Sequence, residues 1–131
     1  MRTRVAVIGG GQSSEHDVSL ASAAAVAGAL DPAAYDVVRL TIDPRGGWRD
    51  DGDRPIGLAG AAGLLESCAV AIPVLHGPHG EDGTVAALCD LAGVPFVGSG
   101  VGAGALAMDK WATKLVARER GLAVAAGRRA R

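Results

Sequence analysis

The first group of side chains that could do chemistry lies in residues 9–20, which read GGGQSSEHDVSL and directly follow the apolar run Val5–Ile8. A glycine turn between a strand and a helix points backbone N–H groups at a ligand, with the positive end of the helix dipole behind them. Glu15 adds a carboxylate to the same turn. This mixture suits a small ligand that carries both an anionic and a cationic group, such as an amino acid, better than a bare phosphate.

A second polar group, residues 76–84 with the sequence HGPHGEDGT, ends another apolar strand further along the chain. Ligands of open α/β sheets bind outside the carboxyl ends of the strands. Both polar loops fall at such ends, so together they define one candidate site.

Each of these residues also has a purely structural interpretation. An acid in the first turn of a helix, such as Glu15, stabilises the helix dipole by about 0.3–1 kcal/mol without any other purpose. His76 at the end of a buried strand needs no more than a hydrogen bond, and we expect His16 and His79 to be solvated. Caps of helices are expected at Ser14 with Asp17, at Asp82 and at Asp109.

Two other kinds of site are less well supported. Gly9 and Gly11 match the first two glycines of the dinucleotide fingerprint G-x-G-x-x-G, but Ser14 stands at the third, and the acid Asp43 is also an ordinary turn residue. The group His76, His79, Glu81 and Asp82 has metal-ligand residue types. Its spacing matches no standard zinc pattern, so we expect no metal site there.

The composition argues against several partners. The net charge of −1 and the four aromatic residues (two Trp, one Tyr, one Phe) offer neither a basic surface nor a stacking platform for nucleic acid. The apolar run at the start is too short for a signal peptide or a membrane span. We interpret Cys68 and Cys89, each in an apolar segment, as reduced core residues of a cytoplasmic protein.

Strands alternate with helices along the chain, which predicts an α/β fold with a parallel sheet. Pro73 favours an edge position or a strand end. The first helix is expected to bury Val18, Ser22, Ala25, Val26, Ala29 and Leu30, and the last to bury Trp111, Leu115 and Val116. The expected strands are 4–9, 35–42, 69–75 and 94–97, with a hairpin tip at 43–48, and the expected helices are 15–30, 57–66, 83–92, 101–108 and 110–120.

Four motifs follow one another along residues 5–115. They are the glycine turn with Glu15 and Val18-Ser19-Leu20; His76-Gly77 with Gly80–Thr84; residues 93–100, GVPFVGSG; and Ala105-Leu106 with Met108-Asp109-Lys110 and Lys114. In this order they resemble the amino-terminal domain of the D-alanine–D-alanine ligase family.

The resemblance implies a Rossmann-like parallel sheet with helices on both faces, which precedes an ATP-grasp region. It implies ATP-dependent joining of two D-alanines through an acyl-phosphate, with Mg²⁺ bridging the phosphates, for peptidoglycan and cell-wall biogenesis in the bacterial cytoplasm. The implied ligands are therefore D-alanine and ATP with Mg²⁺, the last two held mostly outside this chain. A homodimer through this domain is also expected.

The resemblance further assigns roles to single residues. Glu15 would hold the ammonium of the first D-alanine, Val18 would line the same subsite, and Ser19 would help to fix Glu15. His76 would lie beside the same D-alanine, and Lys110 would reach toward the nucleotide phosphates. The chemistry is consistent for Glu15, because an ionised carboxylate pairs with an ammonium while helix N–H groups keep it ionised.

We expect residues 1–121 to form the substrate domain, and residues 122–131 to be a truncated linker toward a missing ATP-grasp domain, with a basic tail from Arg128 to Arg131. On this basis the 131 residues alone are expected not to catalyse ligation. Two alternatives stay open: a non-catalytic, truncated binding or dimerisation module of the same family, and a nicotinamide-binding Rossmann protein.

Overall fold

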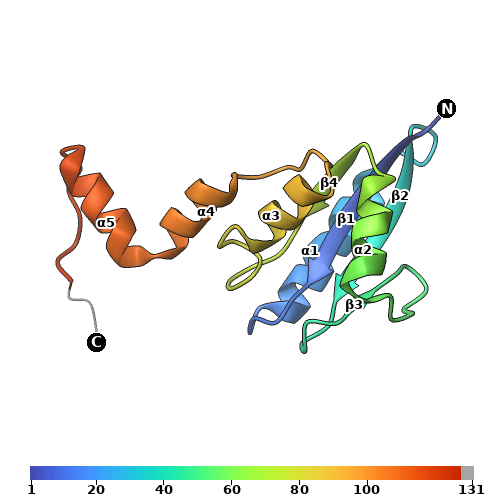
Figure 1. Ribbon diagram of the computed structural model, residues 1–131, viewed down its shortest axis with the longest axis horizontal. Helices are drawn as coiled ribbons and strands as arrows, with labels where there is room; N and C mark the ends of the chain where they lie inside the picture. Colours follow the sequence, from blue (N-terminus) through green and yellow to red (C-terminus); the bar gives the residue numbers. More distant parts are fainter. Residues whose placement is uncertain (128–131) are drawn as a thin grey trace.

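The computed structural model describes residues 1–127 and has an α/β fold (Figure 1). The basic tail expected at residues 128–131 lies outside the described residues. The strands are β1 (Thr3–Gly10), β2 (Tyr35–Ile42), β3 (Trp48–Arg49) and β4 (Val70–Pro73). The helices are α1 (His16–Ala29), α2 (Gly57–Glu66), α3 (Thr84–Leu91), α4 (Val101–Met108) and α5 (Lys110–Glu119).

The four strands form one sheet in the order β3-β2-β1-β4. β1 lies between β2 and β4 and runs parallel to both, and the short β3 pairs antiparallel with β2 as the hairpin predicted at residues 43–48. Residues 5–10 of β1 are all buried, as expected for a parallel strand covered on both faces. The carboxyl ends of β1, β2 and β4 therefore lie at one edge of the sheet.

Helices cover both faces of this sheet, which confirms the predicted fold class. α1 packs along β1 on one face, and α2 and α3 lie together on the other (Figure 1). The larger core lies under α2 and α3. It includes alternate residues of β1 and β2 with buried residues of the two helices, namely Ala6, Ile8, Leu40, Ile42, Ala61, Leu65, Val85 and Cys89.

The buried face of α1 differs from the prediction. Ser19 and Ala23 are its buried residues, whereas the side chain of Val18 is 56% exposed and Ala25 and Ala29 are also exposed. The reason is a close approach at Gly9, where an added Cβ would lie only 2.6 Å from the Cβ of Ala23. Small side chains face the strand because larger ones would not fit between the two backbones.

The start of α1 also differs from the predicted cap at Ser14 and Asp17. Glu15 stands at the N-cap and its side chain makes no capping hydrogen bond. The hydroxyl of Ser13 instead accepts a hydrogen bond from the Glu15 N–H at 3.1 Å. The predicted cap of the last helix is confirmed, because the Asp109 carboxylate accepts from Trp111 N and Ala112 N.

One buried hydroxyl connects α1 to the ends of two strands. Ser19 Oγ accepts a hydrogen bond from the N–H of Gly10 at 2.9 Å and donates one to the carbonyl oxygen of Val74, just after β4. The Ser19 side chain is fully buried. The bond from Gly10 is buried and the bond to Val74 is partly buried, so the loss of either partner is costly.

Two expectations for the second half of the chain are wrong. Residues 94–97 form no regular strand, only an isolated parallel bridge between Phe96 and Ala71, because Pro73, two residues after Ala71, has no N–H to continue the ladder. Trp111, Leu115 and Val116 do not point into a core: Leu115 and Val116 are 48% and 45% exposed, and no residue of α5 is buried. The physical reason is that α5 packs against α4, and both helices extend away from the sheet (Figure 1).

Both cysteines are free and buried, which confirms that they are core residues. Burial raises the pKa of the Cys89 thiol to about 11 and also raises that of Cys68. Within residues 1–127, no helix combines the length and the apolar character needed to cross a membrane.

The close approach at Gly9 is testable by substitution. Gly9→Ala should lower the free energy of unfolding by about 1–3 kcal/mol, because the new methyl group must displace Ala23. As a control in α1, the helix that carries Ala23, Gly28 has no atom within 4 Å of an added Cβ. Gly28→Ala should stabilise by about 0.5–1 kcal/mol through helix propensity. Urea denaturation of both variants checks this, and an unchanged Gly9→Ala midpoint would contradict the close approach.

The buried hydroxyl gives a second prediction. Ser19→Ala leaves the Gly10 N–H and the Val74 carbonyl without their partner, at a cost of about 1–3 kcal/mol for each group. Ser14→Ala, at an exposed position where a cap was expected, should change stability by less than about 0.5 kcal/mol. Thermal and urea denaturation compare the two, and equal losses would refute the buried bridge.

Candidate functional site

The loop from Gly10 to Glu15, which we call the glycine loop, turns tightly over the end of β2. Gly10 and Gly11 have φ angles of +90° and +102°, which side chains rarely adopt. An added Cβ on Gly10 would lie 2.2 Å from the carbonyl oxygen of Ile42, and the N–H of Gly11 donates to that same oxygen at 2.8 Å. The loop is therefore fixed at the strand edge where ligands of such sheets bind.

Glu15 ends this loop at the N-terminus of the 14-residue helix α1. Its side chain is exposed, and none of residues 1–127 forms an ion pair or hydrogen bond with its carboxylate. Val18 lies three residues later on the adjoining turn and is mostly exposed. The two side chains thus offer one negative charge and one apolar surface at the same end of the helix.

His16 is not a solvated residue, contrary to the expectation from sequence. It is half-buried, and its Nδ1 lies 2.7 Å from the carbonyl oxygen of Gly11. A carbonyl oxygen only accepts, so Nδ1 carries the hydrogen in this bond. His16 therefore holds the glycine loop from the helix side, a role visible only once the positive φ of Gly11 turns its carbonyl toward the helix.

The second loop, residues 76–83, is held by its own two carboxylates. Glu81 Oε2 accepts from Gly77 N at 2.7 Å. The Asp82 carboxylate accepts from His79 N at 2.9 Å and from Thr84 N at 3.0 Å, so it holds the start of α3 one residue earlier than a regular N-cap. Burial by itself would raise the pKa of Asp82, but the hydrogen bonds from His79 and Thr84 outweigh it and lower that pKa.

The two loops meet. An added Cβ on Gly77 would lie 3.0 Å from the Cβ of Ser13, and one on Gly11 would lie 3.6 Å from Leu75 Cδ2. Ser13 precedes Glu15 by two residues, and Gly77 directly follows His76. The structure thus brings the glycine loop, which ends at Glu15, against the second loop, which begins at His76, as the parallel strand order predicts. Ser19 lies beneath them and, being buried, acts through Gly10 and Val74.

Lys110 is not brought to this edge. It is exposed and begins α5, which extends away from the sheet (Figure 1). A cavity of about 320 Å³ lies between the end of β4, the loop after it, α3 and α4. Of the residues named for the site from sequence, Glu81 lines this cavity, but Glu15, Val18, His76 and Lys110 do not.

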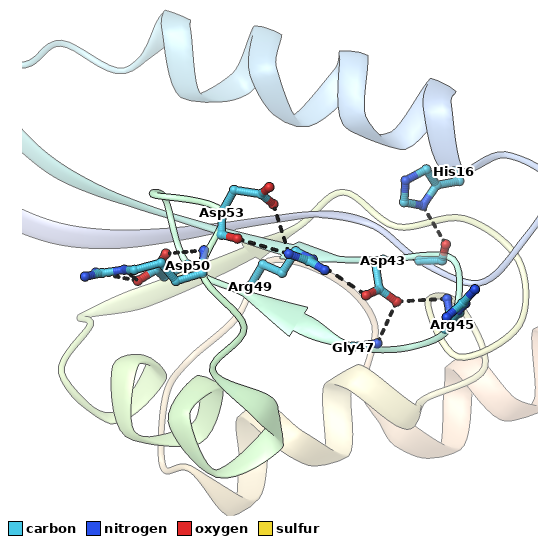
Figure 2. A network of polar contacts seen from close by, with 9 residues as sticks. His16, Asp43, Arg45, Gly47, Arg49, Asp50 and Asp53 are labelled. Carbon is cyan, nitrogen blue, oxygen red and sulfur yellow. Dashed lines mark hydrogen bonds and ion pairs between the residues drawn. The ribbon is translucent and has the colours of Figure 1, made fainter.

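Asp43, the acid weighed as a ribose ligand, is engaged in its own turn. Its carboxylate accepts from Arg45 N and Gly47 N, each at 2.9 Å, and pairs with Arg49 Nε at 3.6 Å (Figure 2). The backbone hydrogen bonds from Gly47 and Arg45, with the Arg49 charge, hold its pKa below the ordinary value. In residues 1–127, no three His, Cys, Asp or Glu side chains are arranged to hold a metal ion.

Comparison with known proteins gives a consistent result. The family model described as D-ala D-ala ligase N-terminus matches residues 4–63 and 51–99. The D-alanine--D-alanine ligase of Methylobacterium sp. (strain 4-46) is 44% identical over 95% of this chain and 39% of its own length. That of Mycobacterium avium (strain 104) is 40% identical over 94% of this chain and 42% of its own length. The chain therefore spans about two-fifths of the length of the curated relatives it matches.

Solved structures agree with this match. The VanG D-Ala:D-Ser ligase from Enterococcus faecalis superimposes with a TM-score of 0.78 at 28% identity, over 95% of this chain and 43% of that one. The D-alanine-D-alanine ligase from Coxiella burnetii gives a TM-score of 0.76 at 29% identity, over 92% and 42% of the two chains. The fold, the family match and the sequence motifs agree: the chain belongs to the D-alanine–D-alanine ligase family, in the region of its N-terminal domain.

Proposed function

We propose that this chain supplies the first D-alanine subsite of an ATP-dependent D-alanine–D-alanine ligase, which makes D-alanyl-D-alanine for peptidoglycan synthesis in the bacterial cytoplasm. The observation that carries the proposal is the Glu15 carboxylate, exposed at the N-terminus of α1 and without a partner among residues 1–127. It stands in a loop that contacts the turn after His76. A zwitterionic ligand would find a cation site and helix N–H groups together there.

The proposed roles follow from where each side chain lies. Glu15 binds the ammonium group of D-alanine, and the exposed side chain of Val18 contacts its methyl group. His76, three residues after the end of β4, orients the same ligand and complements its charge. Ser19 is a positioning residue, because it is buried and holds the loop through the Gly10 N–H.

The nucleotide is proposed to bind mainly through segments beyond the two-fifths of the relatives that this chain spans. ATP use is a property of related enzymes: the relative from Bacillus anthracis was solved in complex with ATP. Lys110 is the cation of this chain proposed to face the phosphates, at the start of α5. The described residues do not form a magnesium site, so no step is derived through the ion. A homodimer through this domain is part of the proposal.

D-Alanine binding tests the subsite. Adding D-alanine to the ¹⁵N-labelled chain should shift the amide signals of residues 11–16 and 76–77 in NMR spectra. Glu15→Gln should weaken binding by about 10- to 100-fold, because a hydrogen bond to a charged group is worth about 1.5–3 kcal/mol. Glu66→Gln, at an exposed position in the last turn of α2, is the matched control and should bind as the wild type does. Equal affinity of the Glu15→Gln variant would refute the assignment, and protection by NAD in a thermal melt would favour the nicotinamide alternative.

An assay of phosphate release from ATP tests whether the reaction needs segments beyond this chain. Acyl-phosphate formation needs a positioned and charge-neutralised phosphate, and among residues 1–127 only Lys110 is assigned to that task. The 131-residue chain should therefore release no phosphate from ATP in a D-alanine-dependent way. Joined to the remaining segments of the Methylobacterium relative, it should do so, and Glu15→Gln in that hybrid should raise the KM for D-alanine. Clear turnover by the chain alone would contradict this proposal.

A further inference from the structure

The segment after β2 contains two turns of the same construction, seven residues apart. In the first, Asp43 Oδ1 accepts from the N–H groups two and four residues later, Arg45 and Gly47, and Asp43 N donates to Gly47 O at 2.8 Å. In the second, Asp50 Oδ1 accepts from Gly52 N and Arg54 N, each at 3.0 Å, and Asp50 N donates to Arg54 O at 3.1 Å. The fourth residue of each turn has a positive φ, +87° at Gly46 and +60° at Asp53.

The first turn contacts the glycine loop through Gly46. An added Cβ on Gly46 would lie 3.0 Å from both Cδ and Oε1 of Gln12 and 3.1 Å from its Nε2. The carboxamide of Gln12 therefore lies against the backbone of the turn. Ile42, the residue just before the turn, accepts the hydrogen bond from Gly11 N. The glycine loop is thus supported by the hairpin at two successive residues, Gly11 and Gln12.

The side chain of Arg49 joins the two turns. Its Nε lies 3.6 Å from Asp43 Oδ2, its Nη1 lies 3.6 Å from Asp53 Oδ1, and Nη1 donates to Asp53 O at 3.0 Å (Figure 2). The neighbouring Trp48 is buried in the core and fixes the hairpin to the sheet. The hairpin is therefore held by the packing of Trp48 in the core and by the contacts of Arg49 with Asp43 and Asp53.

We propose that the Asp43–Gly47 turn positions the glycine loop, which ends at Glu15. Asp43 and Gln12 thereby act as positioning residues for the amino-acid subsite. The inference rests on the proposed function for the identity of the ligand, but the loop contact itself does not. Gly10 and Gly11, where the chain leaves β1 with positive φ, have little conformational preference of their own. His16 of α1 bonds to the Gly11 carbonyl, and the hairpin contacts the loop through Ile42 and Gly46.

The mechanism is a change in the population of the binding-competent loop. If only a fraction of molecules holds Glu15 in place, the apparent dissociation constant rises by the inverse of that fraction. Loss of the turn should therefore weaken ligand binding without removing any group that touches the ligand.

The repeated turn provides its own control. In the 131-residue chain, Asp43→Ala and Asp50→Ala each remove a carboxylate that accepts from two backbone N–H groups and pairs with an arginine. Amide hydrogen exchange of Gly11 and Glu15, measured by NMR without ligand, should become about tenfold faster in Asp43→Ala and stay within about twofold of wild type in Asp50→Ala. D-Alanine affinity should fall by about 3- to 10-fold in Asp43→Ala alone.

Two further variants separate positioning from folding. Gln12→Ala leaves both turns intact and should reproduce the faster Gly11 exchange with an unchanged unfolding midpoint. Asp43→Asn keeps an oxygen for the two backbone N–H groups and should restore most of the D-alanine affinity.

Equal effects of Asp43→Ala and Asp50→Ala on the loop amides would overturn the inference, and so would wild-type exchange in Gln12→Ala. If the wild-type chain fails to bind D-alanine, the proposed function fails, while the exchange rates still decide the positioning role of the turn.

Discussion

The edge of the sheet that carries the candidate site depends on one hydrogen-bond bridge. The buried Ser19 hydroxyl forms it between the Gly10 N–H and the Val74 carbonyl. This bridge requires α1 to lie very close to β1, and that approach is possible because Gly9 has no side chain and Ala23 has a small one. Gly10 is the last residue of β1, and Val74 follows the last residue of β4. The loops that carry Glu15 and His76 therefore leave the sheet from two backbone groups held by one oxygen atom. Their mutual contact, between Ser13 and Gly77, follows from that common attachment.

Much of the fold could be predicted from the sequence because parallel strands buried on both faces are continuous apolar runs. Residues 35–42 form a strand with the bounds predicted, and the helix at 57–66 is also confirmed. The buried face of α1 could not be found in this way. Hydrophobic periodicity selects large apolar residues such as Val18, whereas the contact with β1 is made by the small residues Ser19 and Ala23. The same limit applies to α5, whose amphipathic pattern indicates a partner surface but not where that surface lies.

The candidate site was predicted in part for a topological reason. Carboxyl ends of parallel strands meet at one edge, so the meeting of the Glu15 and His76 loops follows from the strand order. The contact of His16 with the Gly11 carbonyl and the contact of Gln12 with Gly46 could not be foreseen, since they depend on the positive φ angles of Gly11 and Gly46. One signal was present: aspartates at positions 43 and 50 each precede a glycine-containing turn, and Asp side chains commonly bond to backbone N–H groups two residues later. The position of Lys110 depends on how α4 leaves the sheet, which no local pattern describes.

The distribution of bonded carboxylates supports the proposal that the ligand at this edge carries a cationic group. Glu81 accepts from Gly77 N, Asp82 from His79 N and Thr84 N, and Asp43 from Arg45 N and Gly47 N. These three carboxylates accept hydrogen bonds from backbone N–H groups of their own loops, and these bonds fix the shape of the loops. Glu15 differs, because none of residues 1–127 bonds to its carboxylate, while its own N–H is satisfied by Ser13. The exposed Glu15 carboxylate is therefore available to a cationic group of a ligand, beside helix N–H groups that favour an anion. A bare phosphate would meet repulsion from Glu15, and a simple amine would leave the helix N-terminus unused; an α-amino acid satisfies both.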